Sequence, residues 1–432
     1  MAKRKIGMKN IKALLYIIKI DILYSAKFRL SLSHVLYISS ILVRIFNQRR
    51  ADILLMKSHH YSDSSAFQAF LNPKIKKLIK KKGYVQSLLP SVKVSRELIQ
   101  CKYLFLVKPY KSPHEKGVLF LMYGVGFNAF FKHYDVERLL CDYYLVLEPD
   151  WAGYCKPEIL AYAELGSHPV ILESPERLDF AFIKQLESNF IPVEFGSSNW
   201  VDFNIFHPIP GIGKKYDCIM VCDWFNYKRH YALLRALSKI KEYNLKIALV
   251  SNATGNVSTL KNIAHYFGVQ DNITFLQSLP SEKLNIIYNE SKVNLLLSYK
   301  EGANKALFEG MHANIPAILL KNNVGVNKQY INDETGKLID ERDLPKTLVM
   351  FSREYAKFNP RQWVMDNISC QKTTQKLNTI IKDTALRNGE EWTEDIRIKV
   401  KEDGRMRFLH PEDTIIDNHL NNYLRTDMKY EL

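Results

Sequence analysis

The strongest constraint on the fold is an alternation of short apolar runs with amphipathic stretches between residues 117 and 340. The apolar runs have the length of buried strands, and they are 118–123, 143–147, 169–172, 191–195, 218–222, 246–250, 272–276, 295–297 and 317–320. Strands that alternate with helices form parallel sheets with right-handed crossovers. We therefore predict an α/β protein. Ligands of such sheets bind just beyond the carboxyl ends of the strands.

One of the turns after these strands carries two carboxylates. A polar turn follows the strand predicted at 295–297, and a helix predicted at 305–312 comes next. Glu301 lies in the turn, and Glu309 lies eight residues further on, about two helical turns along the chain. The alternative interpretation is a surface helix with two unrelated glutamates.

The same turn offers groups that suit a phosphate. Gly302 allows the backbone to turn tightly and to approach a ligand closely. The first amides of a helix are free hydrogen-bond donors that suit an anion, and here they belong to Ala303, Asn304 and Lys305. A nearby carboxylate accepts hydrogen bonds from sugar hydroxyls. This turn, which starts at Ser298, therefore predicts a site for a nucleotide sugar.

The segment resembles the signature of family 4 retaining glycosyltransferases of GT-B architecture, which reads E-G-F-G-L-P-x-L-E-A-M-A-x-G-x-P. The matching residues are Glu301, Gly302, Glu309, Met311 and Pro316. The chain departs from F-G-L-P with Ala303, Asn304, Lys305 and Ala306, and from the later Gly with Asn314. The resemblance implies two Rossmann-like domains that face a cleft, with the nucleotide sugar held mainly by the second.

Two further segments resemble that family. Residues 201–208 resemble its G-V-D-x-x-x-F-x-P segment, which closes the first domain, and 209–215 form a linker rich in Pro and Gly. The family's G-R-L-x-x-x-K-G segment grips the donor diphosphate, and Lys228 lies at its Lys position. Asp223 stands where the family has Arg, so Arg229 is the candidate substitute. The alternative for Lys228 is an ordinary lysine on a helix surface.

The resemblance implies a role for each of these residues. Glu301 would orient the sugar of a UDP- or GDP-sugar, and Glu309 would bind the ribose hydroxyls. Lys228, with Arg229, would neutralise the leaving diphosphate, and transfer would retain the anomeric configuration. We expect a hexosyltransferase-type enzyme without a metal, because no Asp-x-Asp stands in a strand-end loop.

The amino-terminal residues 1–50 carry eleven Lys and Arg against one acid, with apolar clusters between them. The whole chain has a net charge of +16, which favours anionic partners. No uncharged run in this segment reaches the roughly 18 residues that span a bilayer. We expect a basic helical extension that lies on an anionic membrane. The alternative is a helix packed on a domain with its lysines in water.

Other features give weaker predictions. Gly124 and Gly126 follow a strand and precede a helix, so they are candidates for an acceptor or phosphate loop, with His133 nearby. Cys218 and Cys222 have no second pair, so we interpret them as buried thiols rather than as zinc ligands. No aromatic–basic module of a nucleic-acid binder is present.

These observations predict four segments: a basic segment 1–50, an acceptor domain 51–208, a donor domain 215–385 and a tail 386–432. We expect a cytoplasmic transferase, peripheral on the membrane, that uses a glycan or a lipid-linked glycan acceptor in surface polysaccharide or glycolipid synthesis. Two alternatives remain. One is a sugar-nucleotide epimerase or a phosphorylase on the same fold, and the other is a non-catalytic membrane-binding protein, which Asp223 keeps open.

Overall fold

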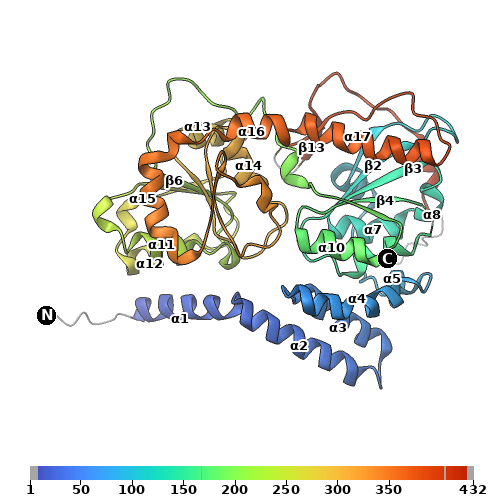
Figure 1. Cartoon of the computed structure of the whole chain (residues 1–432), viewed down its shortest axis with the longest axis horizontal. Coiled ribbons are helices and arrows are strands. Elements are labelled where there is room, and N and C mark those ends of the chain that lie inside the picture. Colours follow the sequence, from blue (N-terminus) through green and yellow to red (C-terminus); the bar gives the residue numbers. More distant parts are fainter. Residues whose placement is uncertain (1–7, 167, 403–404, 426–432) are drawn as a thin grey trace. The chain divides into compact units, whose positions relative to one another are not determined.

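The computed structural model describes residues 8–166, 168–402 and 405–425. The chain forms two compact units, each built around its own sheet (Figure 1). The five-stranded unit comprises Arg29–Trp200 and Cys370–Leu432. The six-stranded unit comprises Met1–Phe28 and Val201–Ser369. The predicted α/β class is confirmed.

The sheet of the five-stranded unit has the order β1-β2-β3-β4-β5. Its strands are β1 (Leu104–Lys108), β2 (Gly117–Met122), β3 (Tyr143–Glu148), β4 (Val170–Glu173) and β5 (Phe190–Val193). β1 is antiparallel to β2, and all other neighbours are parallel. β2, β3 and β4 are buried along their whole lengths, as expected for parallel strands that are covered on both faces.

The sheet of the six-stranded unit is fully parallel and has the order β11-β10-β9-β6-β7-β8. Its strands are β6 (Cys218–Val221), β7 (Ile247–Ser251), β8 (Ile273–Gln277), β9 (Asn294–Leu296), β10 (Ala317–Leu320) and β11 (Gly336–Ile339). The strand order reverses between β6 and β9. Such a switch point is where ligands bind in doubly wound sheets.

Helices complete both units. Those of the five-stranded unit are α3 (Gln48–Tyr61), α4 (Ser65–Ile79), α5 (Tyr84–Ser87), α6 (Arg96–Leu98), α7 (Gly124–His133), α8 (Val136–Leu139), α9 (Pro157–Leu160), α10 (Arg177–Leu186) and α17 (Cys370–Arg387). Those of the six-stranded unit are α1 (Met8–Leu23), α11 (His230–Leu237), α12 (Val257–Phe267), α13 (Ser281–Asn289), α14 (Lys305–His312), α15 (Leu344–Glu354) and α16 (Pro360–Asn367). Helix α2 (Ala26–Val43) belongs to both.

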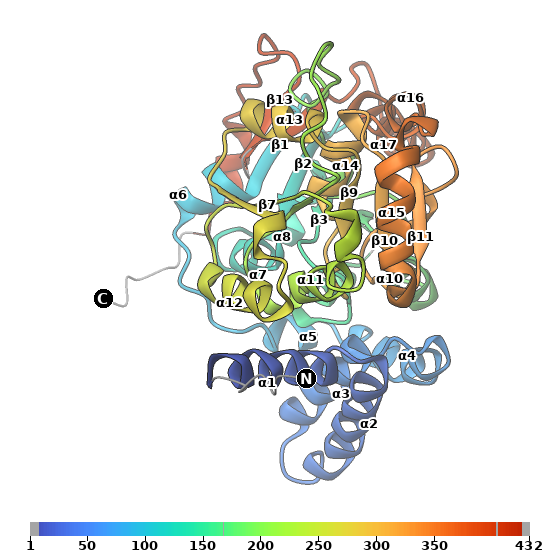
Figure 2. The ribbon, with the colours of Figure 1, turned by 90° about the vertical axis from the view of Figure 1, so that its left-hand side faces the viewer.

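The amino-terminal region is helical, as predicted (Figure 2). Its residues are divided between the two units, so they do not form one separate segment. Ala13, Ile17 and Ile20 of α1 are buried in the core of the six-stranded unit, where α1 contacts α12. Helices α3 and α4 instead belong to the five-stranded unit. Among the described residues, no helix is both long enough and apolar enough to cross a bilayer.

The carboxyl-terminal residues also lie differently from the predicted boundaries. Helix α17 belongs to the five-stranded unit, although the donor domain was predicted to extend to residue 385. The predicted tail contains a hairpin of β12 (Lys399–Glu402) and β13 (Arg405–Phe408). Its lysines Lys399 and Lys401 are buried, which ties the hairpin to this unit.

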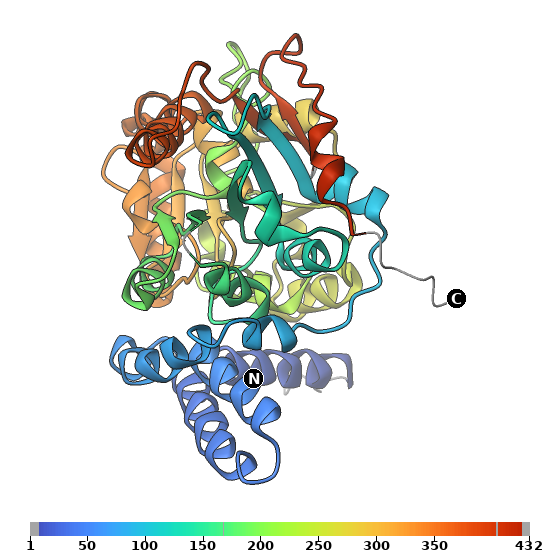
Figure 3. The same ribbon diagram turned by 90° about the vertical axis from the view of Figure 1, so that its right-hand side faces the viewer.

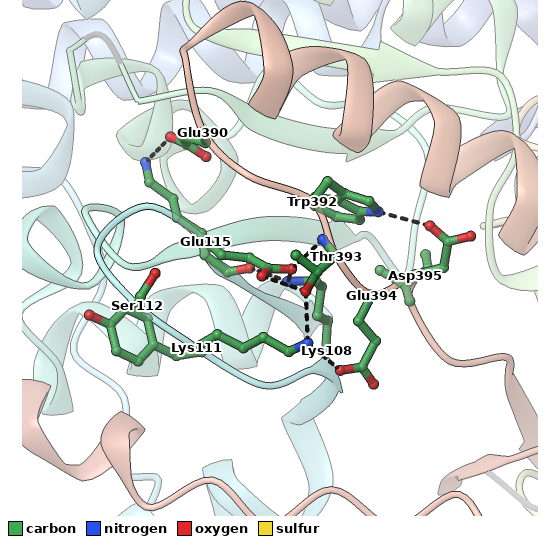
Figure 4. Close-up of polar contacts among 12 residues, drawn as sticks. Lys108, Lys111, Ser112, Glu115, Glu390, Trp392, Thr393, Glu394 and Asp395 are labelled. Atoms are coloured by element: carbon green, nitrogen blue, oxygen red, sulfur yellow. Dashed lines mark hydrogen bonds and ion pairs between the residues drawn. The ribbon is translucent and has the colours of Figure 1, made fainter.

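Buried charges also fix the segment between α17 and β12 (Figure 4). Glu115 is buried and accepts a hydrogen bond from the Thr393 amide at 2.8 Å. Its carboxylate lies 2.9 Å from the ammonium of Lys108, which is fully buried beneath the ring of Trp392. Burial alone would raise the pKa of Glu115, but hydrogen bonds from Lys108 and Thr393 outweigh it and lower the pKa to about 2. The ionised Glu115 thus compensates the charge of Lys108.

Candidate functional site

The carboxyl ends of β6 and β9 bring together the two residues predicted to be catalytic. Lys228 follows β6 and Glu301 follows β9, and these strands are neighbours at the switch point. The ammonium of Lys228 lies 2.7 and 2.8 Å from the two carboxylate oxygens of Glu301. Both side chains are buried, with 9% of Lys228 and 4% of Glu301 exposed. The structure therefore places a compact charge pair where the sheet topology favours a ligand.

The environment of Lys228 keeps it charged. Burial disfavours an ammonium ion and lowers its pKa, but the Glu301 carboxylate outweighs this, so that the pKa of Lys228 is raised above 10.5. The aromatic ring of Tyr227 also lies 5.1 Å from the Lys228 ammonium. Lys228 thus stays protonated in its pair with Glu301, and a protonated lysine suits an anionic group of a ligand.

Glu309 is held on α14 by two partners. Its carboxylate lies 2.7 Å from the ammonium of Lys305, one turn earlier on the same helix. The hydroxyl of Tyr288 donates to the other carboxylate oxygen at 3.3 Å and to the carbonyl of Ala306 at 2.7 Å. Tyr288, on α13, is a site neighbour that the sequence analysis missed, because nothing in its local pattern separates it from an ordinary core tyrosine.

The other donor-site candidates lie around the turn between β9 and α14. Helix α14 begins at Lys305, and the side chain of Asn304 caps it by accepting from the Leu307 amide at 3.0 Å. Ala303 is buried and Gly302 is half-buried. The hydroxyl of Ser298 is buried without a hydrogen-bond partner among the described residues. Buried hydroxyls are normally bonded, so Ser298 is a candidate for a ligand contact.

A second loop, after β10, holds the Glu301 turn by its backbone. The Glu301 amide donates to the Val324 carbonyl at 2.8 Å, and the Val324 amide donates to the Tyr299 carbonyl at 2.9 Å. Gly325 follows with a φ of +117°, and a Cβ atom there would lie 2.2 Å from the Glu301 carbonyl oxygen. Only glycine allows this close approach. Gly325 could not be predicted from its local sequence, since its role depends on a loop 24 residues earlier.

Gly325→Ala should lower activity by about a hundredfold, because the added methyl group displaces the Glu301 turn and small displacements of catalytic groups have large effects. The loss is measured as kcat/KM with the substrate that the site accepts. Gly213→Ala is the matched control, since a Cβ atom at Gly213 meets nothing within 4 Å. Equal activities for both variants would contradict the role given to Gly325.

Arg229 is placed beside Lys228 in the chain but has other partners. It pairs with the carboxylate of Glu341, and its guanidinium donates to the carbonyl of Leu297 at 3.3 Å. Arg229 lines an open pocket of about 520 Å³. Among the residues that the structure describes, Lys228 and Glu301 do not line this pocket. Asp223 accepts from the Ser251 hydroxyl at 3.5 Å. The substitution of Arg229 for the missing arginine stays a prediction.

The three candidates of the first glycine loop lie in the five-stranded unit. Gly124 is the first residue of α7, and its amide lies 3.4 Å from a carboxylate oxygen of Asp150. Gly126 allows α7 to pack closely, since a Cβ atom would lie 2.9 Å from the Tyr103 side chain. His133 is buried and its ring is hydrogen-bonded to a backbone carbonyl. These contacts give all three residues structural roles, and their predicted part in acceptor binding stays a prediction.

Comparisons with known proteins agree with this architecture. Residues 202–350 match the family model described as glycosyl transferases group 1. No curated protein sequence matches the chain.

Several solved structures are similar. Sucrose-phosphate synthase from Thermosynechococcus elongatus has a TM-score of 0.50 at 13% identity, over 62% of this chain and 74% of that one. The C-terminal domain of LpcC, a glycosyl transferase group 1 protein from Francisella tularensis, has a TM-score of 0.35 at 20% identity, over 39% and 98%. Alr3699/HepE from Anabaena, solved with UDP and glucose, has a TM-score of 0.45 at 12% identity, over 60% and 74%. Residues 202–350 are therefore similar to the glycosyl transferases group 1 family, and they lie within an α/β fold like that of GT-B glycosyltransferases.

Proposed function

We propose that the protein is a glycosyltransferase that moves a sugar from a UDP- or GDP-sugar to a glycan or lipid-linked glycan acceptor. The observation that carries the proposal is the buried pair of Lys228 and Glu301, inside the matched domain and at the carboxyl ends of neighbouring strands. One group suits a diphosphate and the other suits sugar hydroxyls, so together they fit the two halves of an activated sugar.

In this proposal the donor separates the charge pair when it binds. The diphosphate then pairs with the ammonium of Lys228, and the sugar hydroxyls donate hydrogen bonds to the carboxylate of Glu301. As the bond from the anomeric carbon to the diphosphate breaks, negative charge grows on the leaving oxygen and Lys228 stabilises it. The acceptor hydroxyl forms the new bond on the same face, so the configuration is retained, and its proton passes to the leaving diphosphate. No metal takes part.

Glu309→Ala should weaken the binding of the donor nucleotide by about tenfold or more, because a hydrogen bond to a charged group contributes roughly 1.5–3 kcal/mol. Titration calorimetry with UDP and with GDP measures the change. Glu354→Ala is the control, because Glu354 is also an acid paired with a lysine near it on a helix but is exposed. Equal nucleotide affinities for the wild type and Glu309→Ala would remove Glu309 from the site.

The experiment that tests the function is nucleotide release from a panel of UDP- and GDP-sugars, with and without a lipid and glycan extract of the source organism. A transferase releases nucleotide faster when the extract is present, and EDTA leaves the rate unchanged. An epimerase instead converts the donor to a new sugar nucleotide without any extract. A phosphorylase acts only on adding inorganic phosphate. If no sugar nucleotide is bound or consumed, the protein is not a transferase.

A further inference from the structure

Helices α2 and α3 form a hairpin in which α2 buries several polar residues and exposes large apolar ones. Arg29, Ser33 and Ser40 of α2 are buried, with at most 7% of each exposed. The Ser33 hydroxyl donates to the Ser58 carbonyl at 2.7 Å, and the Ser58 hydroxyl donates back to the Ser33 carbonyl at 2.8 Å. The two helices are thus joined by small polar side chains, Ser33 of α2 and Ser58 of α3.

Large apolar side chains cover the outward surface of the same helix and its turn into α3. Each is at least 36% exposed, and the set is Phe28, Leu30, Val35, Ile38, Ile41, Leu42, Ile45 and Phe46. The two most exposed are Ile45 at 77% and Phe46 at 88%, and both belong to the turn between α2 and α3. Figure 3 shows the hairpin that these two helices form. A helix on the surface of a protein in water normally buries its apolar face and exposes its polar face. The arrangement in α2 is the opposite. Small residues between helices and apolar residues outside are typical of helices that pack in lipid.

Basic residues flank this apolar surface. Arg44, Arg49 and Arg50 lie around the turn and are exposed, and Lys27 is exposed at the other end of α2. Arg44 is partly neutralised by Asp52 in α3. A positive rim around an apolar surface is complementary to a bilayer with anionic headgroups. Because no helix of the described residues is long and apolar enough to span, the hairpin suits the interface of the bilayer.

Helix α1, in the six-stranded unit, has an unpartnered apolar face of the same kind. While Ala13, Ile17 and Ile20 are buried in the core, five other apolar residues are at least 39% exposed, and they are Leu14, Leu15, Ile18, Ile22 and Leu23. Only one side of α1 thus packs in the core of this unit. The apolar residues on its other side are exposed.

We infer that the α2–α3 hairpin inserts the Ile45–Phe46 turn and the outward face of α2 into the interface of a bilayer that contains anionic lipid. Gathered exposed apolar residues of this kind mark protein or membrane interaction sites. The rival occupant is a second copy of the chain. The inference rests on the hairpin alone, so it stands or falls independently of glycosyl transfer.

The test is flotation of the full chain with vesicles of phosphatidylcholine alone and of phosphatidylcholine with phosphatidylglycerol. We expect binding to the anionic vesicles, weaker binding to the neutral ones, and loss of binding at high salt. The double variant Ile45→Ser/Phe46→Ser should need at least about tenfold more lipid for half-binding. Arg50→Glu should weaken binding to the anionic vesicles alone.

Ile416→Ser is the matched control, since Ile416 is 84% exposed elsewhere in the five-stranded unit and its loss should not change binding. Thermal melts check that all variants stay folded. Failure of the wild type to float with anionic vesicles would overturn the inference, as would unchanged flotation of the double variant. Light scattering without lipid that shows a dimer, converted to a monomer by Ile45→Ser/Phe46→Ser, would assign the surface to a second copy instead.

Discussion

Lys228→Ala and Glu301→Ala should each lower kcat/KM for transfer by at least about a hundredfold. Removal of Lys228 takes away the charge that stabilises the leaving diphosphate, and removal of one such electrostatic group typically costs a factor of 10² to 10³. Removal of Glu301 takes away the group that orients the sugar. Nucleotide release from the active donor in the presence of the acceptor extract measures both losses.

Each single variant also leaves a buried charge without its partner, which costs about 3–5 kcal/mol of stability. The double variant Lys228→Met/Glu301→Gln removes both charges, so it should recover most of that stability but not the activity. Lys292→Ala is the matched control, since Lys292 pairs with Asp217 at 2.7 Å before the amino ends of the same two strands. Wild-type transfer by the double variant would contradict the proposed mechanism.

Glu148→Gln should lower the free energy of unfolding by about 3–5 kcal/mol, measured by urea denaturation. Glu148 is fully buried at the end of β3, and its two oxygens lie 2.8 Å from the ammonium of Lys399 and 3.1 Å from that of Lys401. Burial would raise the pKa of Glu148, but the two lysines outweigh it and lower the pKa. The variant leaves both buried lysines without their anion.

Glu173, at the end of β4, behaves in the opposite way. Burial, and then the charge of Glu148, raise the pKa of Glu173 well above 4.5, so Glu173 is held neutral in the fold. Folding therefore loses stability as the pH rises above 4.5, where the unfolded chain releases this proton. Glu173→Gln should thus stabilise the protein more at pH 7 than at pH 4. The same effect at both pH values would contradict a neutral Glu173.

The two glutamates should also be coupled. When Glu148 is neutralised, the pKa of Glu173 should fall, so that Glu173 ionises and partly replaces the lost anion beside Lys399. The double variant Glu148→Gln/Glu173→Gln should therefore lose more stability at pH 7 than the sum of the single variants. Strict additivity would show that Glu173 does not take over this charge.

The sequence predicted the strands β2 to β10 because they are short apolar runs rich in Val, Ile and Leu, which need no distant partner to be recognised, but it missed β1. Lys228 and Glu301 were both predicted for the site through the resemblance to the glycosyltransferase motifs. Each follows a strand, and parallel strands bring their carboxyl ends to one edge, which explains why the two side chains meet. The sequence did not show that the two side chains form a direct ion pair, in which each charge balances the other.

Other features depend on partners far away in the chain and were missed. The strand Lys399–Glu402 looks like an exposed charged segment in the sequence. Its two lysines are nevertheless buried, where they pair with Glu148, about 250 residues earlier. The amphipathic pattern of α17 shows that it packs on a core but not on which one. The apolar residues of α2 were visible in the sequence. That they are exposed while polar residues are buried was not visible, because only the structure shows which side of α2 contacts α3.

A crystal structure of the protein with the nucleotide that calorimetry selects, UDP or GDP, tests the central claim most directly. The account predicts the diphosphate within hydrogen-bonding distance of the Lys228 ammonium and the ribose hydroxyls at the Glu309 carboxylate, beyond the carboxyl ends of β6 and β9. A nucleotide bound away from both residues, whether in the five-stranded unit or elsewhere, would contradict it.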